Sequence, residues 1–151
     1  MSLPTPVPTK SRSIPVVPVM SSVTPFCTEL TGWTEARLRR QGVPFAEAIR
    51  RLSEKHGAAS RLLVTDSNGD AELVASECRI LGVPQPFGLD RLNVATWFAL
   101  VTRQKRNRGL EHMLATLGLQ FEGTPHRASD DSRNIARLFL KLLQLSGGEV
   151  R

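Results

Sequence analysis

The sequence predicts an α/β domain in which helices outnumber strands. Apolar residues recur at helical spacing in several segments after residue 34, and two short apolar runs have the length of strands. Glycine, proline and small polar residues separate these segments at positions typical of caps and turns. A length of 151 residues and a hydrophobic content of 40% suit one globular domain with a core of its own.

Caps and periodicity predict where the elements lie. Thr34 is expected to cap a helix that ends at Gly42. A second helix is expected to follow Pro44 and to stop at Gly57, with one apolar face formed by Phe45, Ala48, Ile49 and Leu52. Further helices are expected at residues 70–81, near Trp97, at 110–117 and at 127–145, and strands at 61–65 and 92–94.

The first 25 residues differ from the rest in composition. They hold six of the ten prolines and no acidic residue, since the first acid of the chain is Glu29. Each proline fixes φ and removes a backbone donor, so a central strand cannot run through this segment. We expect a disordered, proline-rich N-terminus at residues 1–13, a globular domain at 14–146 and a tail at 147–151.

Charge and composition narrow the class of partner. A net charge of +6 and a pI near 10.3 favour a polyanionic partner such as nucleic acid, although many basic proteins bind none. No apolar run approaches the length that a bilayer requires, so no membrane partner is expected. Cys27 and Cys78 have neither metal-binding spacing nor the pattern of a disulfide framework, which predicts a cytoplasmic protein.

The segment HRASDDSRNIARL, residues 126–138, carries the most informative acids. Ser129 is a candidate N-cap, which would place Asp130 and Asp131 in the first helical turn, where the helix dipole favours acids by ~0.3–1 kcal/mol each. At 100° per residue Asp131 lies on the apolar stripe of the helix, and Asp130 points away from it. That stripe consists of Ile135, Leu138, Leu142 and Leu145. A carboxylate carried toward an apolar interior needs a cation, a metal or strong donors, and His126 could reach the same point.

Asp70 has two readings that the residues alone leave open. It follows the turn DSNG and opens a helix, so it is a good N-cap candidate. It also lies at the carboxyl end of a strand, where α/β proteins place metal ligands and active sites. Asp66, in the same turn, is read as a turn residue.

The run RQKRNR, residues 103–108, contains four cations in six positions. A solvated loop is one interpretation of such a run. The other is contact with a nucleic-acid backbone through Arg103, Lys105, Arg106 and Arg108. The two interpretations differ in their salt dependence, because only the second releases counterions on binding.

Three segments in order resemble one enzyme family. HRASDDSRNIARLFLKLL resembles the third motif of the DEDDh 3′–5′ exonucleases, and LLVTDSNGDAELVASECRILGVPQPFG resembles the region of their second motif. PFCTELTGWT resembles the FCTELTGIT segment of the branch that contains the Eri-type and histone-mRNA 3′ exonucleases. The order holds from about Ile14 to Leu145. The resemblance implies an RNase H-like fold and a 3′–5′ exonuclease acting on RNA or single-stranded DNA by two-metal hydrolysis with Mg²⁺ or Mn²⁺.

The resemblance also implies roles for individual residues. Asp70 and Asp131 match the metal ligands of the second and third motifs, and His126 matches the histidine that acts as general base. The segment matching the pocket for the terminal nucleotide is Leu30, Thr31 and Gly32. One departure is Gly69, which stands where an aromatic residue commonly precedes the second-motif aspartate.

The first motif of the family, a D-x-E pair on the central first strand, has no counterpart here. It belongs upstream of PFCTELTG, and no acid precedes Glu29. We therefore expect an RNase H-like fold truncated at its N-terminus, without its central first strand, and mostly helical in the remainder. Such a chain is expected to be an inactive or very weak enzyme, whether it is a truncated exonuclease or a natural short homologue.

Two further expectations follow from the missing strand. A sheet without its central strand exposes edges, so the chain is expected to self-associate through an exposed edge or to be marginally stable. The alternative function is that of a catalytically inactive homologue that binds nucleic acid or protein. The two functions differ in whether metal-dependent release of mononucleotides accompanies binding.

Overall fold

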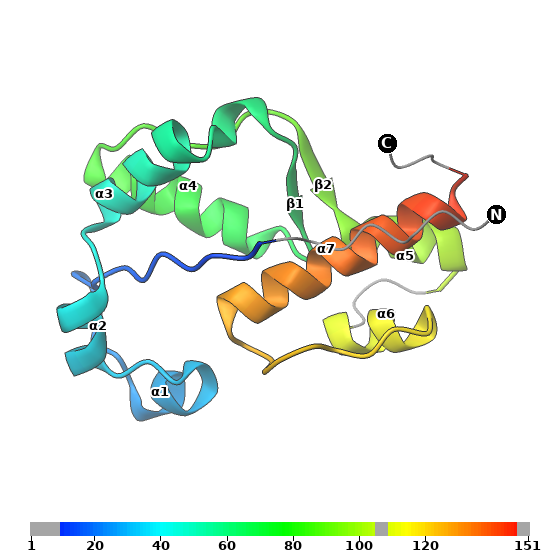
Figure 1. The fold of residues 1–151 in the computed structure, drawn as a ribbon. Coiled ribbons are helices and arrows are strands. Elements are labelled where there is room, and N and C mark those ends of the chain that lie inside the picture. Colours follow the sequence, from blue (N-terminus) through cyan, green and yellow to red (C-terminus); the bar gives the residue numbers. More distant parts are fainter. Residues whose placement is uncertain (1–9, 105–108, 148–151) are drawn as a thin grey trace. The chain divides into compact units, whose positions relative to one another are not determined.

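The computed structural model describes residues 10–104 and 109–147, which form two compact units. Of these residues, the first unit comprises 10–11, Val64–Asn68, 92–104 and 109–147, and the second comprises Arg12–Leu63 and Gly69–Arg91. In chain order the elements are α1 (Pro25–Thr31), α2 (Glu35–Gln41), α3 (Phe45–Arg50), the π-helix η1 (Arg51–Lys55), the 3₁₀ helix η2 (Ala58–Ser60), β1 (Leu63–Thr65), α4 (Gly69–Leu81), β2 (Arg91–Asn93), α5 (Val94–Thr102), α6 (Leu110–Thr116) and α7 (Ala128–Leu145) (Figure 1).

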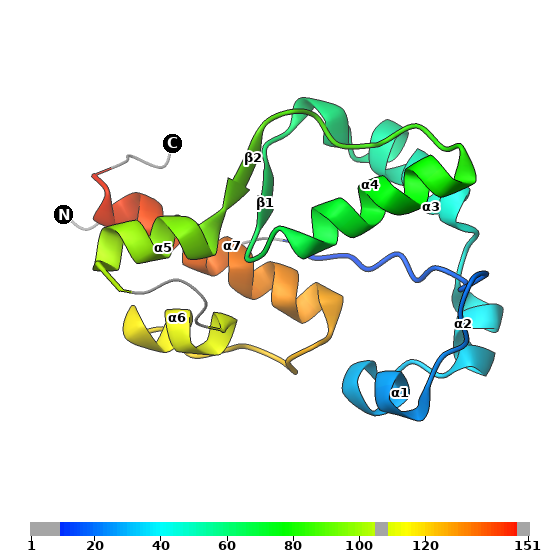
Figure 2. The same cartoon turned by 180° about the vertical axis from the view of Figure 1, so that it is seen from behind.

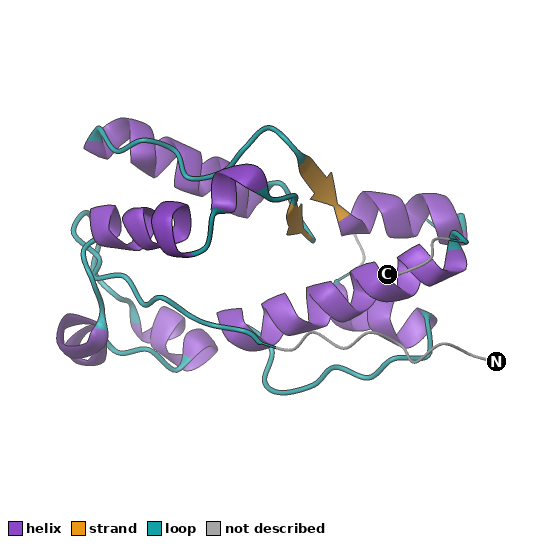
Figure 3. Cartoon of the chain, turned by 45° about the horizontal axis from the view of Figure 1, so that its top comes forward, coloured by secondary structure: helices purple, strands orange, loops and turns teal. Residues whose placement is uncertain are grey.

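Helices make up most of the described chain, and the sheet is small (Figure 3). β1 and β2 pair with each other, and α4 connects them, as in a β-α-β crossover (Figure 2). Within the described ranges this sheet has two strands, and the other β pairing is an isolated parallel bridge between Val16 and Val43. Both predicted strands are confirmed, each as three residues. No helix in this part of the chain is long and apolar enough to cross a bilayer.

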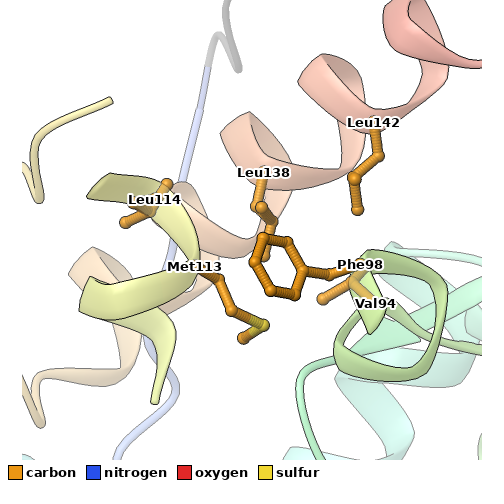
Figure 4. Close-up of a cluster of buried hydrophobic side chains, with 6 residues drawn as sticks. All are labelled: Val94, Phe98, Met113, Leu114, Leu138 and Leu142. Carbon is orange, nitrogen blue, oxygen red and sulfur yellow. The ribbon is translucent and has the colours of Figure 1, made fainter. Parts of the chain in front are cut away.

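The first unit is built on α5, α6 and α7. The core holds six fully buried side chains from these helices: Val94, Phe98, Met113, Leu114, Leu138 and Leu142 (Figure 4). Trp97 and Phe139 pack against this cluster with their rings edge to face at 5.6 Å between centroids. The side chain of Asn93 caps α5 by accepting the backbone N–H groups of Ala95 and Thr96.

The apolar stripe predicted for α7 is confirmed at three of its four positions. Leu138 and Leu142 are fully buried, and Ile135 packs against them. Leu145 is 54% exposed, because the last turn of the helix extends beyond the core. The buried polar residue of α7, Asn134, was not anticipated.

The second unit has a separate core. Phe45, Ile49 and Cys78 are buried in it, and the half-buried residues around them are Val16, Leu52, Val74 and Val83. Thr24 and Thr34 cap α1 and α2 by accepting the N–H groups of Cys27 and Arg37, so the predicted cap at Thr34 is confirmed. Helix α1 was not predicted, since the segment has no apolar periodicity and none of its residues is buried.

Two predicted helix starts are wrong. α7 begins at Ala128 after Arg127, so Ser129 is an early helical residue and not the N-cap. α4 begins at Gly69, so Asp70 is its second residue and not its N-cap. At α7, the acids Asp130 and Asp131 lie inside the helix and accept hydrogen bonds from backbone N–H groups of the preceding loop. The polar contacts at this helix start therefore come from helical residues and not from a residue that precedes the helix.

Candidate active site

The loop that precedes α7 is held by the two adjacent aspartates of that helix. Asp130 Oδ2 accepts the backbone N–H of Thr124 at 3.0 Å, and Asp131 Oδ1 accepts that of His126 at 3.3 Å. His126 has a φ of 64°, a left-handed conformation that is uncommon for a residue other than glycine. The predicted proximity of His126 and Asp131 is therefore present, and it arises through the backbone of His126.

Asp130, predicted to point away from the apolar stripe of α7, contacts the preceding loop. Gly123, at φ 93°, lies so close to it that an added Cβ would stand 2.5 Å from the carboxyl carbon of Asp130. The carboxylate thus occupies the space that a side chain at position 123 would need. The helical wheel did not reveal this contact, because it depends on the loop that folds back over the first turn of α7.

The side chain of Asn134 attaches the same loop to α7 through hydrogen bonds. Its Nδ2 donates to the carbonyl oxygens of Glu122 at 2.9 Å and Asp130 at 2.8 Å, and its Oδ1 accepts the N–H of Glu122 at 3.1 Å. Arg137 donates to Oδ1 of Asn134 at 2.8 Å and to the carbonyl oxygen of Gln120 at 2.7 Å, and it forms an ion pair with Glu122. In the sequence, the only signal for these contacts was that the polar residue Asn134 lies four positions before the apolar residue Leu138.

Asp131 carries its charge in an unfavourable setting. Partial burial raises the pKa of its carboxyl group above the ordinary value, and the nearby charges of Asp66 and Asp130 raise it further. The hydrogen bond from the backbone of His126 and the charge of that residue act in the opposite direction without cancelling the effect. A cation bound at Asp131 would remove the electrostatic cost of keeping this group ionised.

Asp70 lies in the first turn of α4, in the second unit, and it is exposed. Asp131 and His126 belong to the first unit. Because Asp70 and Asp131 belong to different units, their joint binding of a metal stays a prediction. The loop between β1 and α4 also contains Asp66, whose charge acts on Asp131 within the first unit.

The segment predicted to line the nucleotide pocket forms the end of α1. Leu30 is 39% exposed, Thr31 is the last helical residue, and Gly32 is the C-cap with a φ of 75°. Glycine adopts this left-handed conformation without steric cost, so the helix C-cap by itself accounts for a glycine at position 32. Arg37 places its guanidinium over the ring of Trp33, 4.0 Å from the centroid, and donates to the carbonyl oxygen of Gly32. Arg37 was not singled out from the sequence, and its spacing from Trp33 was the available signal.

Comparison with known proteins decides the family. Residues 10–139 match the exonuclease (RNase T) family. This chain belongs to the exonuclease family. It is 28% identical over 142 residues to 3′-5′ exoribonuclease 1 of Mus musculus, a match that covers 88% of this chain and 41% of the relative. It is 30% identical over 134 residues to ERI1 exoribonuclease 3 of Bos taurus, a match that covers 82% of this chain and 39% of the relative. The chain thus spans about two fifths of the length of these curated relatives.

Solved structures confirm the predicted fold class. The nuclease domain of 3′hExo, a DEDDh family member bound to rAMP, superposes with a TM-score of 0.76 at 27% identity, over 90% of this chain and 72% of that one. A 3′-exonuclease in a structure of 3′-end-specific recognition of the histone mRNA stem-loop gives a TM-score of 0.73 at 26% identity, over 90% and 50%. The chain has the RNase H-like fold, in a mostly helical form with a small sheet.

Divalent metals are the usual cofactors of DEDDh exonucleases, so the donor set of this exonuclease can be tested against them. In neither unit do three or more His, Cys, Asp or Glu side chains of the described residues converge as a metal site. One half-buried carboxylate beside an exposed histidine backbone is too small a donor set for two ions, since Mg²⁺ and Mn²⁺ need several oxygen ligands. The described residues of either unit therefore do not form the family's two-ion centre by themselves.

The basic run of the exonuclease falls mostly outside the described residues. Arg103 is the C-cap of α5, with a φ of 57° and an exposed side chain. Lys105, Arg106 and Arg108 lie outside the described ranges. Contact of these four cations with nucleic acid stays a prediction.

Proposed function

We propose that this chain is a 3′–5′ exonuclease-type domain that binds the 3′ end of single-stranded RNA or DNA and hydrolyses it very weakly or not at all by itself. The observation that supports it is Asp131 at the start of α7: a half-buried carboxylate with a raised pKa that accepts the backbone N–H of His126, in a unit whose described residues form no cluster of three or more metal-binding side chains. The sequence also has no acid upstream of Glu29 that could supply the first motif.

The proposed roles follow the chemistry of each side chain. Asp131 and Asp70 would bind Mg²⁺ or Mn²⁺ through hard carboxylate oxygens, which these ions prefer. His126, exposed on the loop, would accept the proton of the attacking water, a step suited to an imidazole whose ordinary pKa is near 6.5. Without the D-x-E pair the metal would bind weakly, which is the physical reason for the low activity.

The substrate side of the proposal rests on the end of α1. Leu30, Thr31 and Gly32 would contact the terminal nucleotide, and the guanidinium of Arg37, fixed over Trp33, adds a positive charge beside them. A net charge of +6 favours a polyanion, with Arg103 and the run that follows it as backbone contacts. RNA is the favoured strand, because the relatives are exoribonucleases and one solved relative recognises a histone mRNA stem-loop.

The test is a Mn²⁺ titration with 3′-labelled single-stranded RNA, using wild type, Asp131→Asn and Asp130→Asn. We expect salt-sensitive RNA binding with at most trace release of mononucleotides. Asp131→Asn should weaken Mn²⁺ binding. Asp130→Asn should change Mn²⁺ binding little, because the wild-type Asp130 carboxylate accepts a hydrogen bond from the backbone of Thr124. Rapid release abolished only by Asp131→Asn would contradict the proposed inactivity, and absence of RNA binding would contradict the whole proposal.

The second candidate function is that of a non-catalytic module that binds nucleic acid or protein. The small sheet supports a related proposal, self-association, because β1 and β2 have no further strand partners among the described residues. Light scattering coupled to size exclusion would measure the mass of the chain as its concentration rises. A monomer at all concentrations, with a cooperative melt, would contradict self-association through an exposed edge.

A further inference from the structure

The second unit contains a pocket that neither the proposed catalytic residues nor the α1 segment lines. Its volume is about 230 Å³, and its lining includes Lys55, His56, Arg61 and Phe87. Aliphatic side chains at the start of β1 complete the wall. All of these residues belong to one unit, so the pocket does not depend on how the two units are arranged.

Irregular backbone on both sides builds the pocket. The π-helix η1 ends at Lys55, and Gly57, in a left-handed conformation at φ 58°, redirects the chain into η2. On the opposite side an added Cβ at Gly88 would lie 2.3 Å from the carbonyl oxygen of Ala59, so these two segments are in direct contact. π-helical turns are rare and often occur at functional sites, which distinguishes this turn from an ordinary helix end.

The lining is cationic and lacks compensating acids. Arg50 and Arg51, one turn earlier, are both paired with Glu47 at 2.7 Å. Among the residues that the structure describes, neither Lys55 nor Arg61 takes part in an ion pair. The charges nearest the pocket are therefore available to an anion, whereas those of the preceding turn are already neutralised.

The apolar part of the lining indicates what the anion carries. Phe87 is half-buried at the pocket wall, and Leu62 beside it is 48% exposed. A flat apolar surface next to two cations suits a planar ring joined to a phosphate, since bases stack on aromatic side chains and phosphates bind Lys and Arg. The volume is below the ~300–1,000 Å³ of sites for whole drug-sized ligands, so it admits one nucleotide at most.

Along β1, the pocket lies at the end away from the turn that leads to Asp70. Leu63, which begins β1, lines the pocket, while the turn that leads to Asp70 follows the last residue of the strand. Ligands of α/β sheets usually bind at the carboxyl ends of the strands, so a site at the opposite end is separate from the expected catalytic edge.

We propose that this pocket is a second nucleotide-binding site, in which Lys55 and Arg61 hold the phosphate and Phe87 contacts the base. The nucleotide is either free or part of a bound strand, and the chemistry of recognition is the same in both cases. The strand-bound form rests on the proposed function, because it requires that the chain bind nucleic acid. The free form does not.

The experiment is an NMR titration of the full chain, following the ring protons of His56 and Phe87. The probes are inorganic phosphate, adenosine, AMP and a single-stranded oligoribonucleotide. We expect AMP to shift both rings and to bind more tightly than phosphate or adenosine. Arg61→Gln should weaken AMP binding at least about tenfold, the lower end of the range for losing a hydrogen bond to a charged group. Phe87→Leu should weaken the binding of AMP and leave the binding of phosphate unchanged.

The control variant is Arg79→Gln, which removes an exposed cation from the last turn of α4 in the same unit. It should leave AMP binding unchanged, and an equal loss in Arg79→Gln and Arg61→Gln would overturn the site. Phosphate binding as tightly as AMP would overturn the role of Phe87, and unmoved rings with every probe would overturn the proposal. Shifts with AMP alone indicate a free nucleotide, and shifts with the oligoribonucleotide indicate a strand. Both support the site, and neither outcome depends on release of mononucleotides.

Discussion

Replacing Asn134 by alanine should destabilise the first unit more than any substitution at an exposed polar residue. Asn134 is fully buried, and its amide makes three hydrogen bonds to backbone groups of Glu122 and Asp130 while accepting a fourth from Arg137. Alanine removes all four and leaves a cavity beside the loop before α7. The loop would then lose its main attachment to the helix.

The expected loss of unfolding free energy is ~2–3 kcal/mol. Each net hydrogen bond contributes ~0.5–1.5 kcal/mol, and part of the loss is recovered because Glu122 is an exposed residue that water can reach. Asn134→Asp should cost more at neutral pH, ~3–5 kcal/mol, because it buries a charge and aims an oxygen at two carbonyl oxygens. The new carboxyl would have a raised pKa, so its penalty should shrink as the pH falls.

Urea unfolding followed by circular dichroism measures these losses, and amide hydrogen exchange at Glu122 reports the loop directly. The matched control is Asn68→Ala, which removes one exposed hydrogen bond to Asn93 in the same unit and should cost at most ~0.5 kcal/mol. A loss for Asn134→Ala as small as that for Asn68→Ala, with protection at Glu122 unchanged, would refute the reasoning.

Three further outcomes are expected. Asp131→Asn should raise the melting temperature in metal-free buffer by about 1–2 °C after allowance for solvent screening, because it removes a charge whose pKa is raised by burial. The gain should vanish as the pH falls below the ordinary carboxyl pKa, where wild type is also neutral, and a persistent gain would contradict this cause. Gly88→Ala should destabilise the second unit by ~1–3 kcal/mol through overpacking, whereas Gly109→Ala, with no described atom within 4 Å of the added Cβ, should cost only the ~0.5 kcal/mol of alanine at the N-cap of α6. With a thiol reagent under native conditions, exposed Cys27 should react quickly and Cys78 slowly, because burial raises the pKa of the Cys78 thiol; equal rates would contradict its burial.

Much of the secondary structure could be predicted because its causes are local. Thr34 and Gly42 delimit α2 as expected, and the apolar periodicity of α3 places Ala48 and Ile49 in the core. α1 escaped prediction because its residues are not buried, so no periodic pattern is required of them. The helix starts near Asp70 and Ser129 were misplaced by one or two residues because the chain offers several acceptors there.

The candidate site could be proposed from the sequence residue by residue, but its contacts could not. Asp131 and His126 were chosen from the motif and are joined in the structure by a backbone hydrogen bond. Asn134 and Arg137 were missed, because their value depends on Glu122 and Gln120, which the loop brings to them across more than ten residues of chain.

The sequence by itself determined the family and which of the family's motifs the printed residues contain. Three motif segments in order identify the exonuclease fold, and the absence of any acid before Glu29 excludes the D-x-E pair from this chain. Tertiary structure alone decided that Asp131 is half-buried beside other acids, and that a basic pocket forms where Ala59 meets Gly88. The reason is physical. Motifs and caps are properties of neighbouring residues, whereas burial and charge clustering arise only when segments distant in the chain come into contact.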